Sequence, residues 1–157
     1  MNIEIARAGQ EDIPDIINLL GQVLEVHHNG RPDIFKTSAT KYKGTELAEL
    51  LSDDKRPIFV AKRGGRVLGY AFCIIKITEN DNILQDTKTL YIDDLCVDES
   101  ERGEGIGRAL YVYVKSYAKE IGCYNLTLNV WECNTGAKRF YESMGLLPRN
   151  TLMETIL

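Results

Sequence analysis

Apolar positions recur along this chain with two different spacings, and these spacings predict its helices and strands. From residue 12 to residue 28 they recur every three or four positions, and Pro14 stands in the first turn, where a helix tolerates proline. The segment 39–51 predicts a second helix. Residues 57–62 and 67–77 are strand-like and are separated by a glycine pair, so together they predict a β-hairpin.

The second half of the chain alternates between strand and helix patterns. Residues 90–97 predict a central strand, and residues 109–121 predict a long helix. Residues 126–134 predict a fifth strand. The apolar spacing after it predicts a short helix, and Gly145 is a natural C-cap for that helix. The last residues of this half, 151–156, predict a final strand.

With a short strand at residues 3–5, the predicted order is β-α-α-β-β-β-α-β-α-β. The hairpin requires antiparallel pairing, and the later strand–helix–strand crossover requires parallel pairing. The polar segment 78–86 predicts an exposed loop. Because no repeat, linker or low-complexity tract divides the chain, we expect one α+β domain, 1–157, built around a mixed sheet.

Composition narrows the functional classes. The chain has 157 residues, 44% of them hydrophobic, which suits one compact domain. A net charge of −4 gives no electrostatic footprint for nucleic acid or an anionic membrane. No apolar run is long enough to span a bilayer and the N-terminus lacks the regions of a signal peptide, so a cytoplasmic protein is expected. The four cysteines form no C-x-x-C pair, which predicts reduced thiols and no metal site.

The segment Arg102–Arg108, which we call the glycine loop, carries the clearest candidate chemistry. It joins the central strand to the long helix. Glycines allow a ligand to approach the backbone, and the N–H groups at a helix N-terminus bind phosphate with the help of the helix dipole. Arginines at both ends add positive charge. The residues expected to contact an anionic cofactor are Arg102, Gly103, Glu104, Gly105, Ile106, Gly107 and Arg108.

The glycine spacing discriminates among nucleotide-binding loops. The dinucleotide fingerprint G-x-G-x-x-G would need a glycine where Arg108 or Leu110 stands, and no segment fits the P-loop motif. The remaining pattern is R-x-x-G-x-G, carried by Arg102, Gly105 and Gly107. It resembles the acetyl-CoA pyrophosphate loop of the GNAT superfamily of N-acetyltransferases. An ordinary glycine-rich turn is the alternative for the loop taken alone.

Two further segments resemble the same superfamily. Residues 126–146 resemble its strand and short tyrosine-bearing helix, and residues 90–97 resemble its central strand. The three signatures occur in the expected order, and the match covers residues 59–147 well. The resemblance implies a GNAT-like, mostly antiparallel sheet flanked by helices, with splayed central and fifth strands. The pantetheine arm of acetyl-CoA would pair in that gap, near Leu95, Cys96 and Val97.

The resemblance also implies catalytic roles. Tyr141 matches a tyrosine that returns a proton to the leaving thiolate, and a core aromatic is its alternative role. Asn134 is expected to cap the short helix, to bond the pantetheine arm, or both. Ribosomal-protein N-terminal-alanine acetyltransferases carry a glutamate base where Asn129 stands here, so that base is missing. Spermidine/spermine acetyltransferases carry Glu-Asp on the central strand, where this chain has Asp93 and Asp94.

The two aspartates compete for the role of general base. On a regular strand they face opposite sides, so at most one faces the cleft unless a bulge intervenes. We take Asp93 as the candidate base, acting through water, and expect Asp94 to contribute less. A solvated or capping role is the alternative for either residue. A backbone N–H at the end of the central strand would stabilise the oxyanion.

The predicted activity is acetyl transfer from acetyl-CoA to a primary amine by direct attack, because no Cys–His or Ser–His pair suggests a covalent intermediate. Residues 27–35 would lie over this acceptor. A polyamine-like amine and a peptide or protein amine both fit, and many relatives form homodimers, which the sequence leaves open. A non-catalytic acyl-CoA-binding sensor or regulatory module is the alternative. A cationic acceptor is expected from the acidic residues Glu25, Asp33, Glu79, Asp81, Asp86, Asp93 and Asp94.

Overall fold

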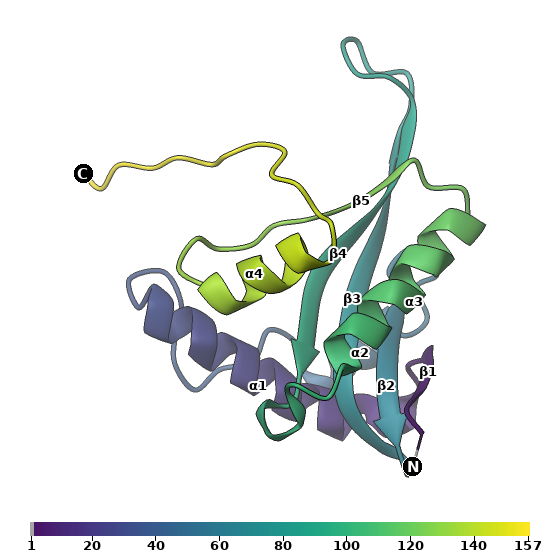
Figure 1. Ribbon diagram of the computed structural model, residues 1–157, viewed down its shortest axis with the longest axis vertical. Helices are drawn as coiled ribbons and strands as arrows, with labels where there is room; N and C mark the ends of the chain where they lie inside the picture. Colours follow the sequence, from purple (N-terminus) through teal and green to yellow (C-terminus); the bar gives the residue numbers. More distant parts are fainter. Residues whose placement is uncertain (1) are drawn as a thin grey trace.

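The apolar runs in the middle of the chain form a five-stranded sheet in the computed structural model, which describes residues 2–157 (Figure 1). The strands lie in the sheet in the order of the sequence. The first four pair antiparallel, and the fifth pairs parallel to the fourth, so the predicted mixed sheet is confirmed. The strands are β1 (Glu4–Arg7), β2 (Ile58–Arg63), β3 (Arg66–Thr78), β4 (Thr87–Val97) and β5 (Asn125–Leu128).

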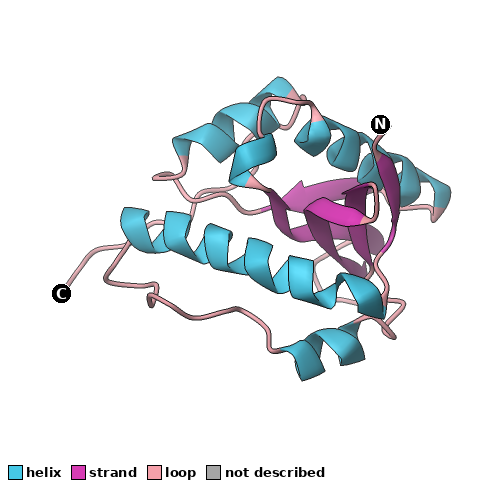
Figure 2. Ribbon diagram, turned by 90° about the horizontal axis from the view of Figure 1, so that it is seen from below, coloured by secondary structure: helices cyan, strands magenta, loops and turns pink. Residues whose placement is uncertain are grey.

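Helices cover both faces of this sheet (Figure 2). The first two pack on one face and the last two on the other. The second helix begins later than predicted, because the Glu46 carboxylate accepts a hydrogen bond from the backbone N–H of Lys43 and so fixes the helix start there. The helices are α1 (Ile13–Gly30), α2 (Gly44–Leu50), α3 (Ile106–Glu120) and α4 (Thr135–Ser143), with short 3₁₀ turns at Gln10–Asp12 and Glu99–Glu101.

The core has two layers, one on each face of the sheet. Strands β2 and β3 contribute to both layers, which explains why their sequences are continuous apolar runs rather than alternating ones. Buried residues of the layer under α1 and α2 include Ile16, Leu19, Leu20, Leu47, Val60, Tyr70 and Cys96. Those of the layer under α3 and α4 include Phe59, Leu90, Ile92, Tyr111 and Val114.

Strands β4 and β5 diverge, as the family resemblance implied (Figure 1). Their pairing ends at Ile92 and Leu128, while β4 continues to Val97 as the partner of β3. The fifth strand therefore ends at Leu128, and the prediction that it reaches Asn134 is wrong. Backbone groups of β4 beyond Ile92 lack a neighbouring strand on this side, which leaves the gap that an extended ligand can enter.

The predicted final strand at residues 151–156 is also wrong, because residues 145–157 form no regular secondary structure. The loop at residues 79–86 is exposed as predicted and ends a hairpin that projects from the body of the molecule (Figure 1). No helix among the described residues combines the length and the apolar character needed to cross a membrane. Within residues 2–157, no three His, Cys, Asp or Glu side chains are grouped so that they could hold a metal ion.

Candidate functional site

The glycine loop leaves backbone donors free at the N-terminus of α3. Gly103 and Gly105 have φ angles of 85° and 80°, which favour glycine, and Gly105 is the N-cap of the helix. The first backbone N–H of this turn that bonds within the helix belongs to Ala109, which donates to the Gly105 carbonyl over 3.0 Å. The preceding N–H groups, at residues 106–108, are therefore oriented to bind an anion.

Side chains on both flanks hold this loop in place. The buried Asp98 carboxylate accepts hydrogen bonds from the backbone N–H and the hydroxyl of Ser100, at 3.0 and 2.7 Å, and from Arg66 at 3.0 Å. The bonds from Ser100 come first among the causes that lower the pKa of Asp98. Arg102 donates from Nε to the Val97 carbonyl over 3.3 Å, which ties the loop to the end of β4.

Gly107 has a different structural role from the two other loop glycines. It lies inside α3, where an added methyl group would sit 3.4 Å from Cζ of Phe140 and 3.5 Å from Cγ2 of Val97. These distances are ordinary van der Waals contacts, so Gly107 marks the place where α4 packs on the start of α3, and an added methyl group would fit there. Asn134 begins α4 and caps it, because its side-chain oxygen accepts a 3.2 Å hydrogen bond from the backbone N–H of Ala137.

A β-bulge at Asp93 places both aspartates of β4 on one face of the sheet. Phe72 pairs with Asp94 and Cys73 pairs with Ile92, so Asp93 is an extra residue without a partner on β3. Ile92 belongs to the core layer under α3, and both aspartates contact residues of the opposite face. The regular alternation expected from the sequence is therefore interrupted at this point.

The two carboxylates have different partners. Asp93 forms an ion pair with Lys41, whose Nζ lies 2.7 Å from its Oδ2. Asp94 accepts a 2.8 Å hydrogen bond from the hydroxyl of the buried Tyr70. Burial raises the pKa of Asp94 to about 6, although the Tyr70 hydrogen bond and the Lys41 charge oppose this shift. With a pKa of about 6, Asp94 is mostly ionised at neutral pH and takes up a proton in mildly acidic solution.

Tyr141 lies on α4 in a half-buried position. Burial is the main cause that raises the pKa of its hydroxyl, and the negative charge of Asp94 adds to it. The hydroxyl therefore stays protonated at neutral pH, as a proton donor must. Its neighbour Phe140 packs against the core layer under α3, at a ring-centroid distance of 5.2 Å from Tyr141.

An aromatic cluster joins the α1–α2 loop to the β5–α4 loop. The His27 and Phe35 rings stack at 4.9 Å, and Phe35 meets Trp131 edge-on at 5.2 Å. Burial, followed by the charge of Lys41, lowers the pKa of His27 and keeps its ring neutral. Sequence reasoning did not identify Lys41, Tyr70 or Trp131, since no motif or periodicity distinguishes a loop lysine, a strand tyrosine and a loop tryptophan from ordinary packing.

The acidic residues expected near an acceptor do not converge on one site. Glu79, Asp81 and Asp86 belong to the projecting β3–β4 hairpin, the last two bonding backbone N–H groups of the same loop (Figure 1). Asp33 is bound at two points by Arg31, and Asp93 is bound by Lys41. The combined negative field that favoured a cationic acceptor is therefore not assembled.

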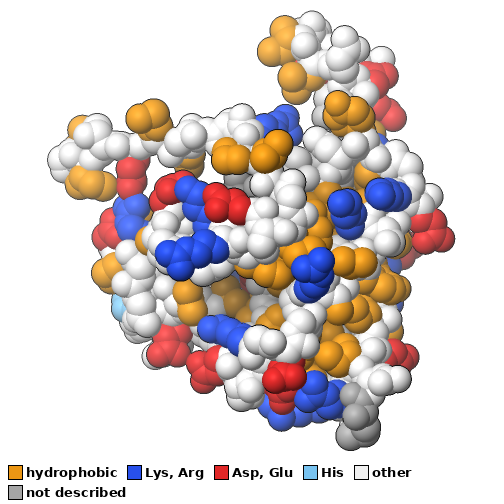
Figure 3. All heavy atoms as spheres, viewed as in Figure 1, with side chains coloured by type: hydrophobic (Ala, Val, Ile, Leu, Met, Phe, Trp, Pro, Cys, Tyr) orange, Lys and Arg blue, Asp and Glu red, His pale blue; other side chains and the backbone are white. Residues whose placement is uncertain are grey.

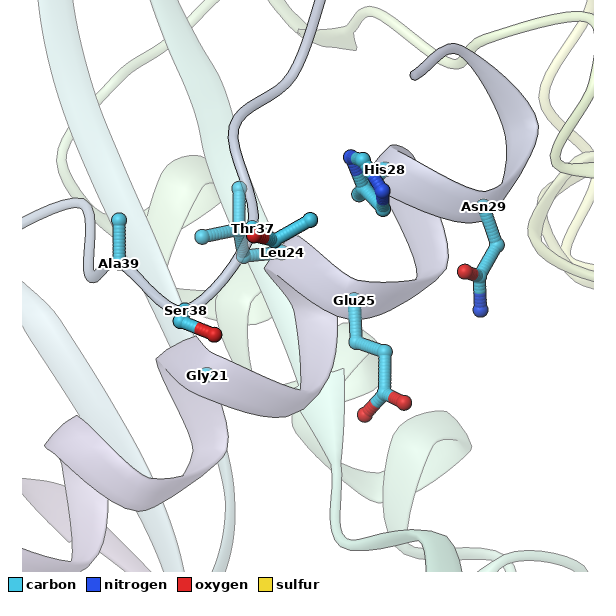
Figure 4. A pocket seen from close by; sticks show the side chains of 8 residues that line it. All are labelled: Gly21, Leu24, Glu25, His28, Asn29, Thr37, Ser38 and Ala39. Carbon is cyan, nitrogen blue, oxygen red and sulfur yellow. The ribbon is translucent and has the colours of Figure 1, made fainter.

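A cavity of about 350 Å³ lies between α1 and the segment 37–39 (Figure 4). It holds Glu25, the remaining acidic residue of the expected set, beside His28, whose Nδ1 lies 2.7 Å from the Phe35 carbonyl. Neither Asp94 nor Tyr141 lines this cavity. Its lining residues are Gly21, Leu24, Glu25, His28, Asn29, Thr37, Ser38 and Ala39.

Comparisons with known proteins agree on one family. Residues 23–146 match the model of the acetyltransferase (GNAT) family. An uncharacterized N-acetyltransferase from Archaeoglobus fulgidus is 32% identical over 144 residues, which are 92% of both chains. A probable glucosamine 6-phosphate N-acetyltransferase from Drosophila melanogaster is 34% identical over 143 residues, covering 89% of this chain and 59% of that protein. The crystal structure of a mutant BH1408 protein from Bacillus halodurans superposes with a TM-score of 0.94 at 31% identity, over 98% of this chain and 99% of the other.

Proposed function

Because the chain belongs to the GNAT family of acetyltransferases, we propose that it transfers an acetyl group from acetyl-CoA to a primary amine by direct attack. Asp94 and Tyr141 serve as base and acid. The observation that carries this assignment is geometric: the bulge on β4 leaves the Asp94 carboxylate bonded to the buried Tyr70 hydroxyl just beyond the point where β4 and β5 part, and Tyr141 lies on α4, the helix that follows β5. The proposed pair is a carboxylate and a phenol. Such a pair supplies the two proton transfers that the reaction needs.

The residues present fit acetyl-CoA as the donor. The free N–H groups at residues 106–108 suit the pyrophosphate, and two glycines with positive φ let it approach the backbone. The gap beyond Ile92 and Leu128 suits the pantetheine arm, with residues 95–97 as its backbone partners. Asn134 already caps α4 through its side-chain oxygen, so its amide nitrogen is the atom left to contact the arm.

Asp94 replaces Asp93 as the proposed base. Asp93 forms an ion pair with Lys41, whose Nζ lies 2.7 Å from its Oδ2. Asp94 carries a raised pKa of about 6 and meets a neutral hydroxyl instead. A base with a pKa near the working pH combines a large ionised fraction with useful proton affinity. In the proposed reaction Asp94 draws the proton of the amine through a water molecule.

The remaining steps form the amide bond and release CoA. The amine nitrogen attacks the thioester carbon, and a backbone N–H at residues 95–97 stabilises the oxyanion, a contribution worth roughly 10²–10³ in rate. The carbon–sulfur bond then breaks, and Tyr141 returns a proton to the thiolate. Burial and the Asp94 charge raise the pKa of this phenol, so it is still protonated when the thiolate forms. The products are an N-acetylated amine and free CoA, and the proton held by Asp94 passes through water to the Tyr141 phenolate, which restores both groups.

The charge of the acceptor is the finer question. The acidic residues that favoured a cation lie apart or are paired with Arg31 and Lys41. Two relatives, 26% and 34% identical, are a glucosamine 6-phosphate N-acetyltransferase and a probable one, so their acceptor is an amino sugar phosphate. We therefore propose a primary amine as the acceptor, and the amine panel below tests whether that amine is cationic.

The test is mass spectrometry of an amine panel incubated with the protein and acetyl-CoA. The panel contains a polyamine, a peptide with a free N-terminus, a lysine peptide and an amino sugar. We expect one member to gain a single acetyl group, with equimolar release of free CoA. The Tyr141→Phe variant serves as the matched control. Cofactor binding without transfer to any amine in a broad panel would favour the non-catalytic acyl-CoA-binding module instead.

A further inference from the structure

One primary amine of the chain lies beside the proposed base. The Nζ atom of Lys41 is 2.7 Å from Oδ2 of Asp93, and the bulge places Asp93 on the same face of β4 as Asp94. Both carboxylates lie just past Ile92, the last residue of β4 that pairs with β5. Lys41 therefore presents its amine at the start of the gap in which we expect the pantetheine arm.

Aromatic packing holds the segment around Lys41 in this place. The ring of the next residue, Tyr42, stacks on Phe72 with the ring centroids 5.5 Å apart. Phe72 is the strand partner of Asp94 and meets the Tyr70 ring edge-on at 4.9 Å. The hydroxyl of Tyr70 in turn donates to Asp94. Packing as well as charge thus keeps the lysine beside the base.

The backbone that carries Lys41 is free to advance toward the thioester. Among the described residues, no backbone–backbone hydrogen bond involves residues 36–42. Leu95, where we expect the thioester oxygen to bind, is two residues past Asp93, about 7 Å along an extended strand. Figure 3 shows the surface hollowed between α4 and α1, which flank the sheet from opposite faces. The lysine therefore has both the reach and the room to meet a bound thioester.

We propose that the protein acetylates its own Lys41, using the acetyl-CoA bound to the same chain. This rests on the acetyl transfer proposed above and adds an acceptor that the chain itself carries. The Lys41 ammonium first gives one proton through water to Asp94. Its nitrogen then attacks the thioester carbon, the carbon–sulfur bond breaks, and Tyr141 protonates the thiolate. The second nitrogen proton restores Tyr141 through water, and the first leaves Asp94 for solvent, so the products are acetyl-lysine, free CoA and one proton.

The ion pair makes this reaction slow and dependent on pH. Burial alone would lower the pKa of the Lys41 amine, but the hydrogen bond to Asp93 and the charges of both aspartates outweigh burial and raise it. The amine is therefore protonated at neutral pH, and the rate should rise from pH 7 to pH 9 as the reactive neutral form becomes more abundant. The acetylated side chain is neutral, so the product no longer forms an ion pair with Asp93.

The first test is incubation of the protein with saturating acetyl-CoA and no added amine, followed by intact mass and peptide mapping. We expect one acetyl group per chain, on Lys41. Lys43 is the internal control, because this exposed lysine forms no ion pair among the described residues and is the more open of the two to spontaneous acylation. Equal or greater acetylation of Lys43 would overturn the proposal. So would a rate constant that rises with protein concentration, because the lysine of one copy would then react in the site of another.

The second test uses variants. Lys41→Arg keeps a positive charge beside Asp93 but offers no primary amine, so the acetyl group should be absent while the circular-dichroism spectrum stays unchanged. Asp94→Asn and Tyr141→Phe should each slow the acetylation of Lys41 by roughly 10²–10³ and leave the slow labelling of Lys43 as it is. Parental rates at Lys41 in both variants would mean spontaneous chemistry at a reactive lysine, which contradicts the proposal.

The amine panel separates this inference from the proposed function. Acetylation of a panel amine by a protein whose Lys41 stays unmodified would overturn the self-acetylation and leave the acetyl transfer in place. Binding of acetyl-CoA without transfer to any panel amine or to Lys41 would overturn both. Acetylation of Lys41 that depends on Asp94 and Tyr141 would support both.

Discussion

The Tyr70 hydroxyl donates a 2.8 Å hydrogen bond to Asp94 from the neighbouring strand β3. This contact exists because the bulge at Asp93 turns Asp94 toward the face on which Tyr70 is buried. Two adjacent carboxylates thereby share one face of β4 but differ in their surroundings, since Asp93 has a lysine and Asp94 has a phenol. The difference allows their roles to be separated by mutation.

Replacement of each aspartate should give a different pH profile. Asp94→Asn is expected to lower kcat/KM by roughly 10²–10⁴, the range of a general base, and to remove the acidic limb near pH 6. Asp93→Asn should keep most of the activity and move that limb to lower pH, because the negative charge of Asp93 contributes to the raised pKa of Asp94. Steady-state kinetics from pH 5 to pH 9 would measure both. Equal losses in the two variants would contradict our choice of Asp94.

The raised pKa of Asp94 also makes a prediction for stability. Its folded pKa of about 6 lies above the 3.8 of a free aspartate, so folding favours the protonated form. The stabilisation is complete below the unfolded pKa and is lost as the pH rises through the folded one. Relative to Asp94→Asn, the parent should lose free energy of unfolding between about pH 4 and pH 7 and change little above that. Urea unfolding of both proteins across this range checks the sign.

The tyrosine prediction separates chemistry from packing. Tyr141→Phe keeps the half-buried ring and removes the hydroxyl, so the melting temperature and CoA affinity should change little while turnover falls by roughly 10²–10³. Tyr124→Phe is the matched control, since its ring is 83% exposed and lies outside the proposed site. Turnover at the parental rate in the Tyr141→Phe protein, with chemistry shown to be rate-limiting, would leave Tyr141 a packing role only.

The glycine-loop prediction uses two glycines with the same backbone conformation. Gly105 and Gly65 have φ angles of 80° and 82°, and a Cβ on either would meet no atom within 4 Å. Both Gly105→Val and Gly65→Val therefore strain the backbone, but only the first places a side chain where the pyrophosphate is expected. CoA should raise the melting temperature of the parent and of Gly65→Val, and this shift should be lost in Gly105→Val. A full shift in a folded Gly105→Val protein would remove the loop from the cofactor site.

The parts of the fold that were predictable are those encoded by local sequence. Helix α1 follows from its apolar periodicity, and the β2–β3 hairpin follows from its glycine pair between two strand-like runs. The early end of β5 was not predictable. Residues 129–134 alternate like a strand, but β4 and β5 diverge after Ile92 and Leu128, so these residues have no strand to pair with. The predicted last strand is absent because residues 151–156 pair with no strand of the sheet, and strand propensity alone does not form a strand.

The site residues that lie in one continuous motif were predictable from the sequence. Those that meet through contacts between distant segments were not. The glycine loop and the α4 tyrosine lie in continuous motifs. The choice between Asp93 and Asp94 depended on a bulge, which is a mismatch between two strands and has no signature in either sequence. The partner of Asp93, Lys41, comes from a segment without regular structure 52 residues earlier in the chain. Such contacts follow from the packing of the whole molecule.

Lys41 gives the last prediction, because its charge is one of the forces that hold down the pKa of Asp94. Lys41→Gln removes that charge and leaves Asp93 without its ion-pair partner, so Asp94 should bind its proton more tightly. The acidic limb of kcat/KM should then move from about pH 6 to higher pH, with a rate loss at pH 6.5 and little change above pH 8. Lys43→Gln is the matched control, because among the described residues this exposed neighbour forms no ion pair with either carboxylate. If the acidic limb keeps its position in Lys41→Gln but is abolished in Asp94→Asn, the charge of Lys41 is screened from the Asp94 carboxylate. If neither variant changes it, the limb belongs to another group, and Asp94 loses its role as the base.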